Sequence, residues 1–383
     1  TGKAHTMSDT LGVGIIGCGN ISTTYFDLVP LFKGLEVRAC ADMNPEAAKA
    51  RSSEYGVRAD TVEGLLLADD IDIVVNLTIP DAHWPVSRDI LSAGKHVYSE
   101  KPLTLTLEDG VAMRKLAAEK GVKVGSAPDT FLGGAHQRAR KAIDEGKIGQ
   151  ITSGTCHVMS HGMEHWHPNP DFFFLPGGGP ILDLGPYYIA NLVNLVGPVK
   201  RVAALTSMAT PTRTISSQPR AGELIPVKTP TNIHALLEFE NGATITLSAS
   251  WDVWAHRHEN MELYGTEGSL YLPDPNFFGG DVILAGTDGK AETLADEGHP
   301  LGIPNQDHGN GKMANYRAAG LADMALAILE ERDYRCSLDR ALHAVDVMTS
   351  ILKSGETGEF VDISTPCDRP AALGKAEAEA MLR

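Results

Sequence analysis

Apolar and polar positions alternate along the first third of the chain in blocks that have the lengths of strands and helices. Short apolar runs, typical of strands buried on both faces, are separated by longer segments with helical spacing. The strand-like runs are 13–16, 36–42, 70–80, 95–100 and 122–128. Strands that alternate with helices in this way predict right-handed crossovers and a doubly wound, parallel α/β sheet.

The pattern changes from about residue 131. One helical segment, 134–149, is followed by the strand-like segments 151–160, 200–208, 232–251 and 260–272. Asn241-Gly242 separates two alternating runs and predicts a tight hairpin turn. Strands joined by hairpins predict a large, mainly antiparallel sheet in an α+β domain. The segment 210–231, rich in Pro, Ser and Thr, predicts a long exposed loop.

The chain has 383 residues, which is too long for one ordinary core, so at least two domains are expected. The change of pattern divides it into a first domain at 9–130 and a second at 131–366. The Ala-rich segment 367–383 predicts a C-terminal helix or a tail.

Composition and charge exclude several classes of partner. The formal net charge is −16 and no basic stripe is present, which argues against nucleic acid. No apolar run has the roughly 18 residues of a membrane span, and the first ten residues lack the apolar region of a secretory signal. The five cysteines show no paired spacing, which favours a reducing cytoplasm over a disulfide framework or a thiolate zinc site.

A glycine-rich turn follows the first strand and opens a helix. The segment Gly17-Cys18-Gly19-Asn20-Ile21-Ser22 matches G-x-G-x-x-G, with a small serine at the third position. Such glycines allow a tight turn and a close approach of the backbone to a pyrophosphate at the helix N-terminus. We expect Gly17, Gly19, Asn20 and Ile21 to contact a dinucleotide in a Rossmann-type domain.

Asp42 ends the second predicted strand, 23 residues after Gly19. An acid at this place can accept hydrogen bonds from the adenosine ribose, and it repels a 2′-phosphate. No arginine immediately follows Asp42. NAD is therefore favoured over NADP, and the alternative is a glycine turn with a purely structural role.

Several motifs in this order resemble the glucose–fructose oxidoreductase, inositol dehydrogenase and MocA (Gfo/Idh/MocA) family. They are GIIGCGNIS, VVNLTIPDAH, SEKP, GGGPILDLGPYYIANLVNLVG and GTEGSLYLPDP. The E-K-P tripeptide combined with the later G-G-x-x-x-D-x-G is specific to that family, whereas the glycine motif alone is not. The resemblance covers most of the chain and implies an NAD-dependent oxidoreductase.

The resemblance also implies positions for the cofactor. It assigns cofactor contacts to Thr78, Pro80, His83, Glu100 and Lys101. It directs Lys101 into the active site and implies an unusual, cis peptide bond before Pro102. Ligands of open parallel sheets bind at the carboxyl ends of the strands, which accounts for an acid and a base at this place. The alternative is a surface ion pair on a loop.

Asp183 and Tyr187 are four residues apart in a helical segment and therefore share one face. Inositol dehydrogenase-like members have Asp-x-x-x-His, whose His is the proposed acid/base, whereas this chain and glucose–fructose oxidoreductase have tyrosine. We expect Tyr187 to accept the proton of the substrate hydroxyl, and Lys101 to lower the pKa of the Tyr187 phenol and to anchor the substrate. We expect Asp183 to accept a hydrogen bond from a substrate hydroxyl. Two alternatives stay open: Lys101 carries the proton itself, or Tyr187 and Tyr188 are packing residues.

The segment 161–174 holds three histidines and a tryptophan, and it predicts a substrate loop made by His165, Trp166 and His167. A flat indole beside hydrogen-bonding groups suits a sugar ring. One alternative is that these histidines bind a metal, but their spacing matches no strong metal-ligand motif. The other alternative is that they are loop histidines without a functional role. Asp129, after the last strand of the first domain, and Tyr316, near a helix start, are further candidates for substrate contact, although Tyr316 can equally belong to a solvated first turn.

These predictions favour an NAD-dependent enzyme that oxidises a secondary hydroxyl of a sugar, glycoside or cyclic polyol, including oxidation of glycosides at carbon 3. One alternative is a glycoside hydrolase that retains NAD and uses transient oxidation and elimination. Another is a non-catalytic sugar–NAD sensor, against which Lys101 and Asp183 argue. The resemblance implies a homodimer or homotetramer formed through the sheet of the second domain.

Overall fold

A computed structural model of the chain describes residues 10–309 and 311–383. Residues 1–9 lie outside the described residues. They include the predicted start of the first domain at residue 9 and most of the segment that is predicted to lack a secretory signal. The chain divides into two compact units. The first holds the chain up to residue 129 with 316–342 and 373–383, and the second holds 130–315 and 343–372. Two later segments of the chain thus belong to the N-terminal unit.

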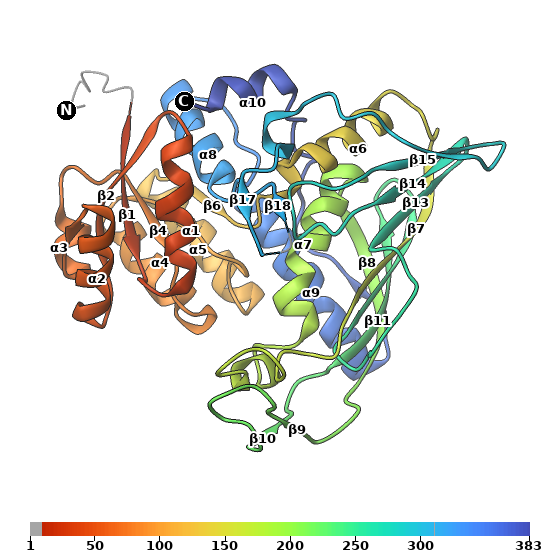
Figure 1. The fold of residues 1–383 in the computed structure, drawn as a ribbon, viewed down its shortest axis with the longest axis horizontal. Coiled ribbons are helices and arrows are strands. Elements are labelled where there is room, and N and C mark those ends of the chain that lie inside the picture. Colours follow the sequence, from red (N-terminus) through yellow and green to blue (C-terminus); the bar gives the residue numbers. More distant parts are fainter. Residues whose placement is uncertain (1–9, 310) are drawn as a thin grey trace. The chain divides into compact units, whose positions relative to one another are not determined.

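The first unit contains, within the described residues, a parallel sheet of six strands in the order β3-β2-β1-β4-β5-β6 (Figure 1). The strands are β1 (Leu11–Ile16), β2 (Leu35–Ala41), β3 (Arg58–Ala59), β4 (Ile73–Asn76), β5 (His96–Ser99) and β6 (Val124–Ser126). The predicted doubly wound parallel sheet is confirmed. The direction of winding changes between β1 and β4, and ligands bind at such a switch point, at the carboxyl ends of the strands.

The helices of this unit begin and end at local sequence signals. They are α1 (Asn20–Leu28), α2 (Pro45–Tyr55), α3 (Val62–Leu67), α4 (His83–Ser92) and α5 (Leu107–Lys120). The Asn44 side chain accepts a hydrogen bond from the N–H of Glu46 and caps α2, and Thr106 caps α5 in the same way. Gly121 ends α5 in the left-handed conformation, which glycine adopts at no steric cost.

The segments that return to the first unit carry α8 (Ala319–Glu330) and α10 (Lys375–Met381). A buried ion network ties them together. Asp323, which is fully buried in α8, accepts hydrogen bonds from the N–H and the guanidinium of Arg335 at 2.7 and 2.8 Å. Arg335 also donates to both carboxylate oxygens of Glu377 in α10 at 2.8 Å. Arg335 thus bridges two helices that are far apart in the sequence.

The second unit contains, within the described residues, a nine-stranded sheet in the order β16-β15-β14-β13-β7-β12-β11-β8-β19 (Figure 1). Its longer strands are β7 (Ile151–Met159), β8 (Val199–Ser207), β11 (Asn232–Phe239), β12 (Thr244–Ser250), β13 (Met261–Gly265) and β14 (Gly268–Leu272). The remaining strands are β15 (Ile283–Gly286), β16 (Ala291–Thr293) and β19 (Val361–Asp362). β7 and β12 are parallel and the other pairs are antiparallel, which confirms a mainly antiparallel sheet.

Helices cover one face of this sheet. They are α6 (Gly134–Asp144), α7 (Pro180–Leu195) and α9 (Leu338–Thr357). The first residues of α9, up to Leu342, belong to the first unit. The inward-facing residues of the strands, such as Ile233, Leu247 and Leu263, are fully buried in one core with Leu192 of α7 and Met348 of α9. The side chains that alternate with them lie on the opposite face of the sheet.

The segment 210–231 is largely exposed, as predicted, but it is not a simple loop. Two short strands, β9 (Thr212–Thr214) and β10 (Leu224–Pro226), pair antiparallel within this segment. The buried side chains of Ile215, which directly follows β9, and Ile225 of β10 form a small core with Phe174 and Trp251. We call residues 161–175, 210–231 and 251–254 the aromatic lobe. The high Pro, Ser and Thr content of 210–231 gives no indication of this core in the sequence. Its apolar residues come from three separate parts of the chain.

The five cysteines, all within the described part of the chain, are free thiols. Among those same residues, no group of three or more His, Cys, Asp or Glu side chains is arranged to hold a metal ion. No helix in residues 10–309 or 311–383 combines the length and the apolar composition needed to cross a membrane.

Candidate active site

The turn between β1 and α1 requires glycine at one position and leaves open space at another. Gly17 has a φ of +101°, and a Cβ atom there would lie 2.6 Å from the carbonyl oxygen of Leu77. Any side chain at Gly17 would therefore be strained and would clash with main chain. No atom lies within 4 Å of the Cβ position at Gly19. The turn thus exposes a stretch of backbone that a ligand can approach closely.

Helix α1 begins at this exposed backbone. Gly19 is its N-cap, and no side chain caps the helix. Gly19 and Asn20 are exposed, and Ile21 is half-buried. Ser22 is fully buried and donates to the carbonyl of Gly19 at 2.6 Å, so the third position of the motif keeps its close packing. The N–H groups and the positive end of the helix dipole fit a pyrophosphate.

Asp42 joins the glycine turn to the end of β2. Its Oδ2 accepts the N–H of Cys18 at 2.7 Å, and its Oδ1 accepts the N–H of Asn44 at 2.8 Å. The side chain is half-buried, and each oxygen keeps further capacity to accept a hydrogen bond, as from a ribose hydroxyl. Its negative charge disfavours a 2′-phosphate. The residues at this strand end therefore fit NAD.

His83 is buried, and main-chain oxygens face both of its ring nitrogens. Nδ1 lies 2.6 Å from the carbonyl oxygen of Pro102, and Nε2 lies 3.0 Å from that of Thr78. Burial lowers the pKa of His83, and a neutral ring can donate to only one of the two oxygens at a time. The imidazole thus connects the loops that follow β4 and β5, and the protein occupies both of its nitrogens.

Asn76, which the sequence interpretation omitted, shapes the loop that carries Thr78 and Pro80. Its Oδ1 accepts the N–H and the hydroxyl of Thr78 at 3.2 and 2.7 Å. Its Nδ2 donates at 3.0 Å to the carbonyl of His83 and to the hydroxyl of Ser87. A fully buried amide that satisfies four partners fixes the loop geometry. A single asparagine inside the apolar run VVNL was the available signal.

Glu100 and Lys101 follow the carboxyl end of β5, and both are half-buried. Glu100 Oε1 accepts the hydroxyl of Tyr25 at 3.1 Å, and its Oε2 accepts the N–H of Lys101 at 3.0 Å. Burial, followed by the charge of Glu100, raises the pKa of Tyr25 well above its ordinary value. The Lys101–Pro102 peptide is cis, as the resemblance implies. Tyr25 of α1 and the backbone of Lys101 together fix the Glu100 carboxylate.

Asp129 is 3% exposed and binds the start of α8. Its Oδ2 accepts the N–H groups of Ala318 and Gly320 at 3.0 and 2.9 Å. The carboxylate thus satisfies main-chain donors at a helix N-terminus, where negative charge is favourable. Tyr316, just before this helix, is 6% exposed, and burial raises its pKa. Both residues predicted to contact substrate are therefore largely buried.

We expect Asp129 to give the protein a pH-dependent stability. Burial raises the pKa of Asp129 from 3.8 to about 6, so the folded state binds its proton more tightly than the unfolded chain does. The free energy of unfolding should therefore decrease as pH rises from 3.8 towards 6, by up to about 3 kcal/mol. Urea unfolding across this range should show that Asp129→Asn removes this component. The exposed Asp89→Asn is the control, and identical pH profiles for Asp129→Asn and the parent would contradict the assignment.

Helix α7 carries Asp183 in its first turn and Tyr187 one turn later, and both are half-buried. The side chain of Tyr187 packs against the core of the second unit. Tyr188 is 1% exposed, donates its hydroxyl to the carbonyl of His157 at 3.1 Å and accepts a hydrogen bond from Asn260 at 3.1 Å. Tyr188 is thus a satisfied core residue. Asp183 and Tyr187 remain as the polar pair that α7 holds on one face.

The predicted substrate loop exposes an indole beside imidazoles. Trp166 is 58% exposed, and His165 is also exposed. His167 is half-buried, meets Trp166 edge-on at a ring separation of 5.4 Å, and accepts the N–H of Asn169 at 3.1 Å. The main chain of the lobe also reaches α7, because the N–H of Gly179, its N-cap, donates to the carbonyl of Phe173 at 2.7 Å. The loop therefore leads directly into the helix that carries Asp183.

Arg213 anchors this loop, and the sequence contained no signal for it. It is 7% exposed and donates to Glu164 at 2.8 Å, to the carbonyl of Trp251 at 2.8 Å, and to Asp252. Glu164 lies only two residues before Trp166, so a buried ion pair fixes the base of the loop. The partners come from two segments that are distant from Arg213 in the sequence, and breaking such a pair leaves an uncompensated buried charge.

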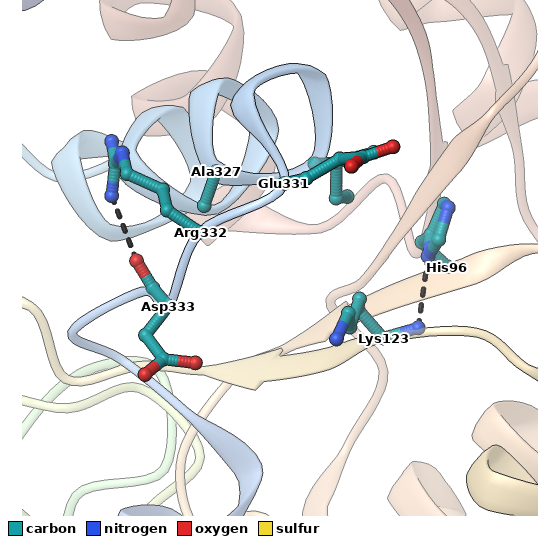
Figure 2. A pocket seen from close by; sticks show the side chains of 7 residues that line it. His96, Lys123, Ala327, Glu331, Arg332 and Asp333 are labelled. Atoms are coloured by element: carbon teal, nitrogen blue, oxygen red, sulfur yellow. Dashed lines mark hydrogen bonds between the residues drawn. The ribbon is translucent and has the colours of Figure 1, made fainter.

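A cavity of about 570 Å³ lies elsewhere in the first unit (Figure 2). It adjoins the amino ends of two strands, where His96 begins β5 and Lys123 precedes β6, and it also adjoins the end of α8 at Arg332. The N–H of Lys123 donates to Nδ1 of His96 at 2.9 Å. Ligand sites of open parallel sheets lie at the carboxyl ends of the strands. This cavity is therefore separate from the candidate site.

Comparison with known proteins identifies the family. Residues 11–127 match the model described as "Oxidoreductase family, NAD-binding Rossmann fold", and residues 136–271 match the model "GFO/IDH/MocA C-terminal domain". The chain belongs to the Gfo/Idh/MocA family. It is an oxidoreductase with an NAD-binding Rossmann domain, as predicted from the motifs.

Named relatives and solved structures agree with this assignment. The chain is 30% identical over 291 residues to levoglucosan dehydrogenase of Pseudarthrobacter phenanthrenivorans, a match that spans 68% of this chain and 73% of that protein. It is 31% identical over 142 residues to inositol 2-dehydrogenase of Rhizobium meliloti, spanning 37% of this chain and 43% of that protein. The structure of levoglucosan dehydrogenase in complex with NADH superimposes with a TM-score of 0.77 at 23% identity, covering 93% of this chain and all of that one.

Proposed function

We propose that the protein is an NAD-dependent dehydrogenase that oxidises a secondary hydroxyl of a sugar or cyclic polyol. The observation that carries the proposal lies within one sheet: the glycine turn after β1 and the Glu100-Lys101 pair after β5 both lie at carboxyl ends of parallel strands. A dinucleotide turn and an ionisable pair at the same edge suit proton and hydride transfer from one alcohol. Relatives named as levoglucosan and inositol 2-dehydrogenases support this substrate class.

In the proposed mechanism, the glycine turn at Gly19 and the carboxylate of Asp42 would hold NAD, which would supply the hydride acceptor for the alcohol carbon. Tyr187 accepts the proton of the substrate hydroxyl. The role we propose for Lys101 is to assist this transfer, since an ammonium placed beside a phenol would favour the phenolate. Asp183 accepts a hydrogen bond from a neighbouring substrate hydroxyl and thereby orients the ring. In the alternative assignment Lys101 is itself the proton acceptor.

The substrate loop supports a sugar as the ligand. Trp166 offers a flat apolar face to the C–H groups of a sugar ring, and His165 and His167 offer hydrogen-bonding groups beside it. We propose that these three residues bind the substrate. A finer form of the proposal is that the substrate is a glycoside oxidised at carbon 3, because an exposed indole can accept a second ring.

The test is a substrate panel followed at the absorbance of the reduced cofactor. Purified protein with NAD or NADP is incubated with free sugars, inositols, levoglucosan and glucosides. We expect reduction of NAD with at least one member of the panel, and slower or no reduction of NADP because of Asp42. NMR of the product identifies the oxidised carbon and decides the finer proposal. Absence of turnover with every member would count against the function.

No observation on the described residues favours the hydrolase alternative. The relatives named above are dehydrogenases, and a transient oxidation would require release of an aglycone without net reduction of NAD. The same panel distinguishes the two chemistries, because aryl glucosides release a coloured phenol only by hydrolysis.

We also propose that the protein is a homodimer or homotetramer formed through the large sheet. On the face opposite the helices, Leu205 of β8 and Leu236 of β11 are 76% and 52% exposed, and nearby Phe360 is 61% exposed. These three apolar side chains line a cavity of about 500 Å³. Exposed apolar patches of this kind are typical of association surfaces.

Leu236→Glu should convert the oligomer to monomers, because a symmetric contact would then bury an unpaired charge on each subunit. Light scattering coupled to gel filtration measures the mass. Leu224→Glu is the matched control, since Leu224 is 64% exposed in β10 of the aromatic lobe and outside the sheet. A monomeric parent protein would refute the proposal.

A further inference from the structure

A buried tyrosine of α1 reaches the acid that precedes Lys101. Tyr25 is 2% exposed, and its hydroxyl donates to Oε1 of Glu100 at 3.1 Å. The other oxygen of the same carboxylate, Oε2, accepts the N–H of Lys101 at 3.0 Å. The Glu100 carboxylate thus bridges the main chain of Lys101 and a helix that begins at the glycine turn. The proposed mechanism assigns no role to this tyrosine.

Packing alone does not require the hydroxyl of Tyr25. A phenylalanine would fill the same buried space, and burying a hydroxyl costs free energy unless it is hydrogen-bonded. Burial, followed by the charge of Glu100, raises the pKa of the phenol well above its ordinary value, so the group stays protonated and acts as a donor. A hydrogen bond to a carboxylate is stronger than one between two neutral groups. The hydroxyl therefore holds the Glu100 carboxylate in one orientation.

The side chain of Glu100 can transmit this restraint because its own main chain is fixed. The N–H of Glu100 donates to the carbonyl of Asn76, the last residue of the neighbouring strand β4, at 2.9 Å. Once the main chain is fixed, the orientation of the side chain decides where Oε2 lies. Oε2 in turn holds the N–H of the next residue, Lys101. The hydroxyl of Tyr25 is thus linked through one carboxylate to the residue that the mechanism requires.

We propose that Tyr25 is a positioning residue for the reaction, and that it places Lys101 for proton transfer through Glu100. The inference rests on the proposed function, because Lys101 is there the group that assists or accepts the proton. Displacement of a reacting group by about 1 Å can cost about a hundredfold in rate. The loss of this restraint should therefore affect the chemical step more than it affects binding.

Tyr25→Phe keeps the buried ring and removes the hydroxyl. We expect kcat to fall about tenfold, whereas KM for the substrate found in the panel and the dissociation constant of NAD should change less than about threefold. Tyr334→Phe is the matched control, because it removes another tyrosine hydroxyl of the first unit, which donates to the carbonyl of Val124 at 2.6 Å. The control should lose stability and keep the parental kcat. A parental kcat in Tyr25→Phe, or an equal fall of kcat in both variants, would overturn the proposal.

A double variant tests the route through Glu100. Glu100→Gln offers one carbonyl oxygen to two donors, so either the hydroxyl of Tyr25 or the N–H of Lys101 loses its acceptor. Removing the competing hydroxyl leaves that oxygen to Lys101. Tyr25→Phe combined with Glu100→Gln should therefore be at least as fast as Glu100→Gln alone, whereas two independent defects would multiply. A double variant that is slower by the full tenfold factor would exclude Glu100 as the intermediary and overturn the proposal.

A measurement without turnover separates this proposal from the proposed function. The lysine side chains are labelled by reductive methylation with isotope-labelled formaldehyde, and the NMR signal of Lys101 is the one that is absent from Lys101→Met. Tyr25→Phe should shift this signal, and Tyr334→Phe should leave it in place. An unchanged signal in Tyr25→Phe overturns the positioning role. If the parent is inactive on every member of the panel, the proposed function is refuted, and the labelled spectrum still decides whether Tyr25 acts on Lys101.

Discussion

Lys101→Met should lower kcat by about 10²- to 10⁴-fold, the usual contribution of a positioned proton-transfer group. The variant keeps the length of the side chain and removes its charge. If Lys101 supports Tyr187 as proposed, its removal leaves an ordinary phenol, which is a poor proton acceptor at neutral pH. Stopped-flow measurement of NAD reduction, with the substrate found in the panel, gives the rate of the chemical step. Titration with NAD should show a much smaller change in cofactor affinity.

Two further substitutions decide which group carries the proton. Lys101→Arg keeps the positive charge but cannot release a proton, because guanidinium stays protonated in proteins. If Lys101 only supports the phenolate, this variant should recover part of the rate, and Tyr187→Phe should be as slow as Lys101→Met. If Lys101 accepts the proton, Lys101→Arg stays slow and Tyr187→Phe is affected less. Lys123→Met, an exposed lysine before β6, should behave as the parent, and a Lys101→Met enzyme with the parental rate would exclude both roles.

The fold of the first unit could be predicted because each element carries its own local signal. Apolar runs mark the strands, and residues such as Gly121 and Thr106 mark the ends of α5. Strand β3 was missed because its residues, Arg58 and Ala59, are exposed and provide no apolar pattern. The segments 316–342 and 373–383 could not be assigned to this unit, because their attachment depends on Asp323, Arg335 and other side chains whose partners are distant in the sequence.

The candidate site was predictable where a motif is contiguous and hidden where partners are distant. Gly17, Gly19 and Asp42 could be placed because strand–turn–helix spacing fixes them. The role of His83 could not be foreseen, because the oxygens that face its ring belong to Thr78 and Pro102 on two different loops. Side chains that act through distant partners are visible only in the folded chain.

Gly19→Ala should abolish most NAD binding without destabilising the fold. The backbone at Gly19 has φ −74°, which alanine adopts without strain, and no protein atom lies within 4 Å of the added methyl group. The methyl group would instead occupy the space through which a pyrophosphate approaches the start of α1. We expect the dissociation constant for NAD to rise at least about a hundredfold, a loss of about 2.8 kcal/mol, with an unchanged melting temperature for the apo protein. Calorimetric titration and differential scanning calorimetry measure the two quantities.

Gly17→Ala separates this effect from ordinary damage to the turn. Its methyl group would meet the carbonyl oxygen of Leu77 at 2.6 Å on a backbone with φ +101°, so this variant should lose both NAD binding and thermal stability. Gly56→Ala, at the left-handed end of α2, should lose a little stability and keep NAD binding. If the cofactor binds at this turn, Gly19→Ala must lose NAD affinity without losing thermal stability, whereas Gly17→Ala must lose both. Normal NAD affinity in Gly19→Ala would show that the cofactor does not approach the chain at this turn.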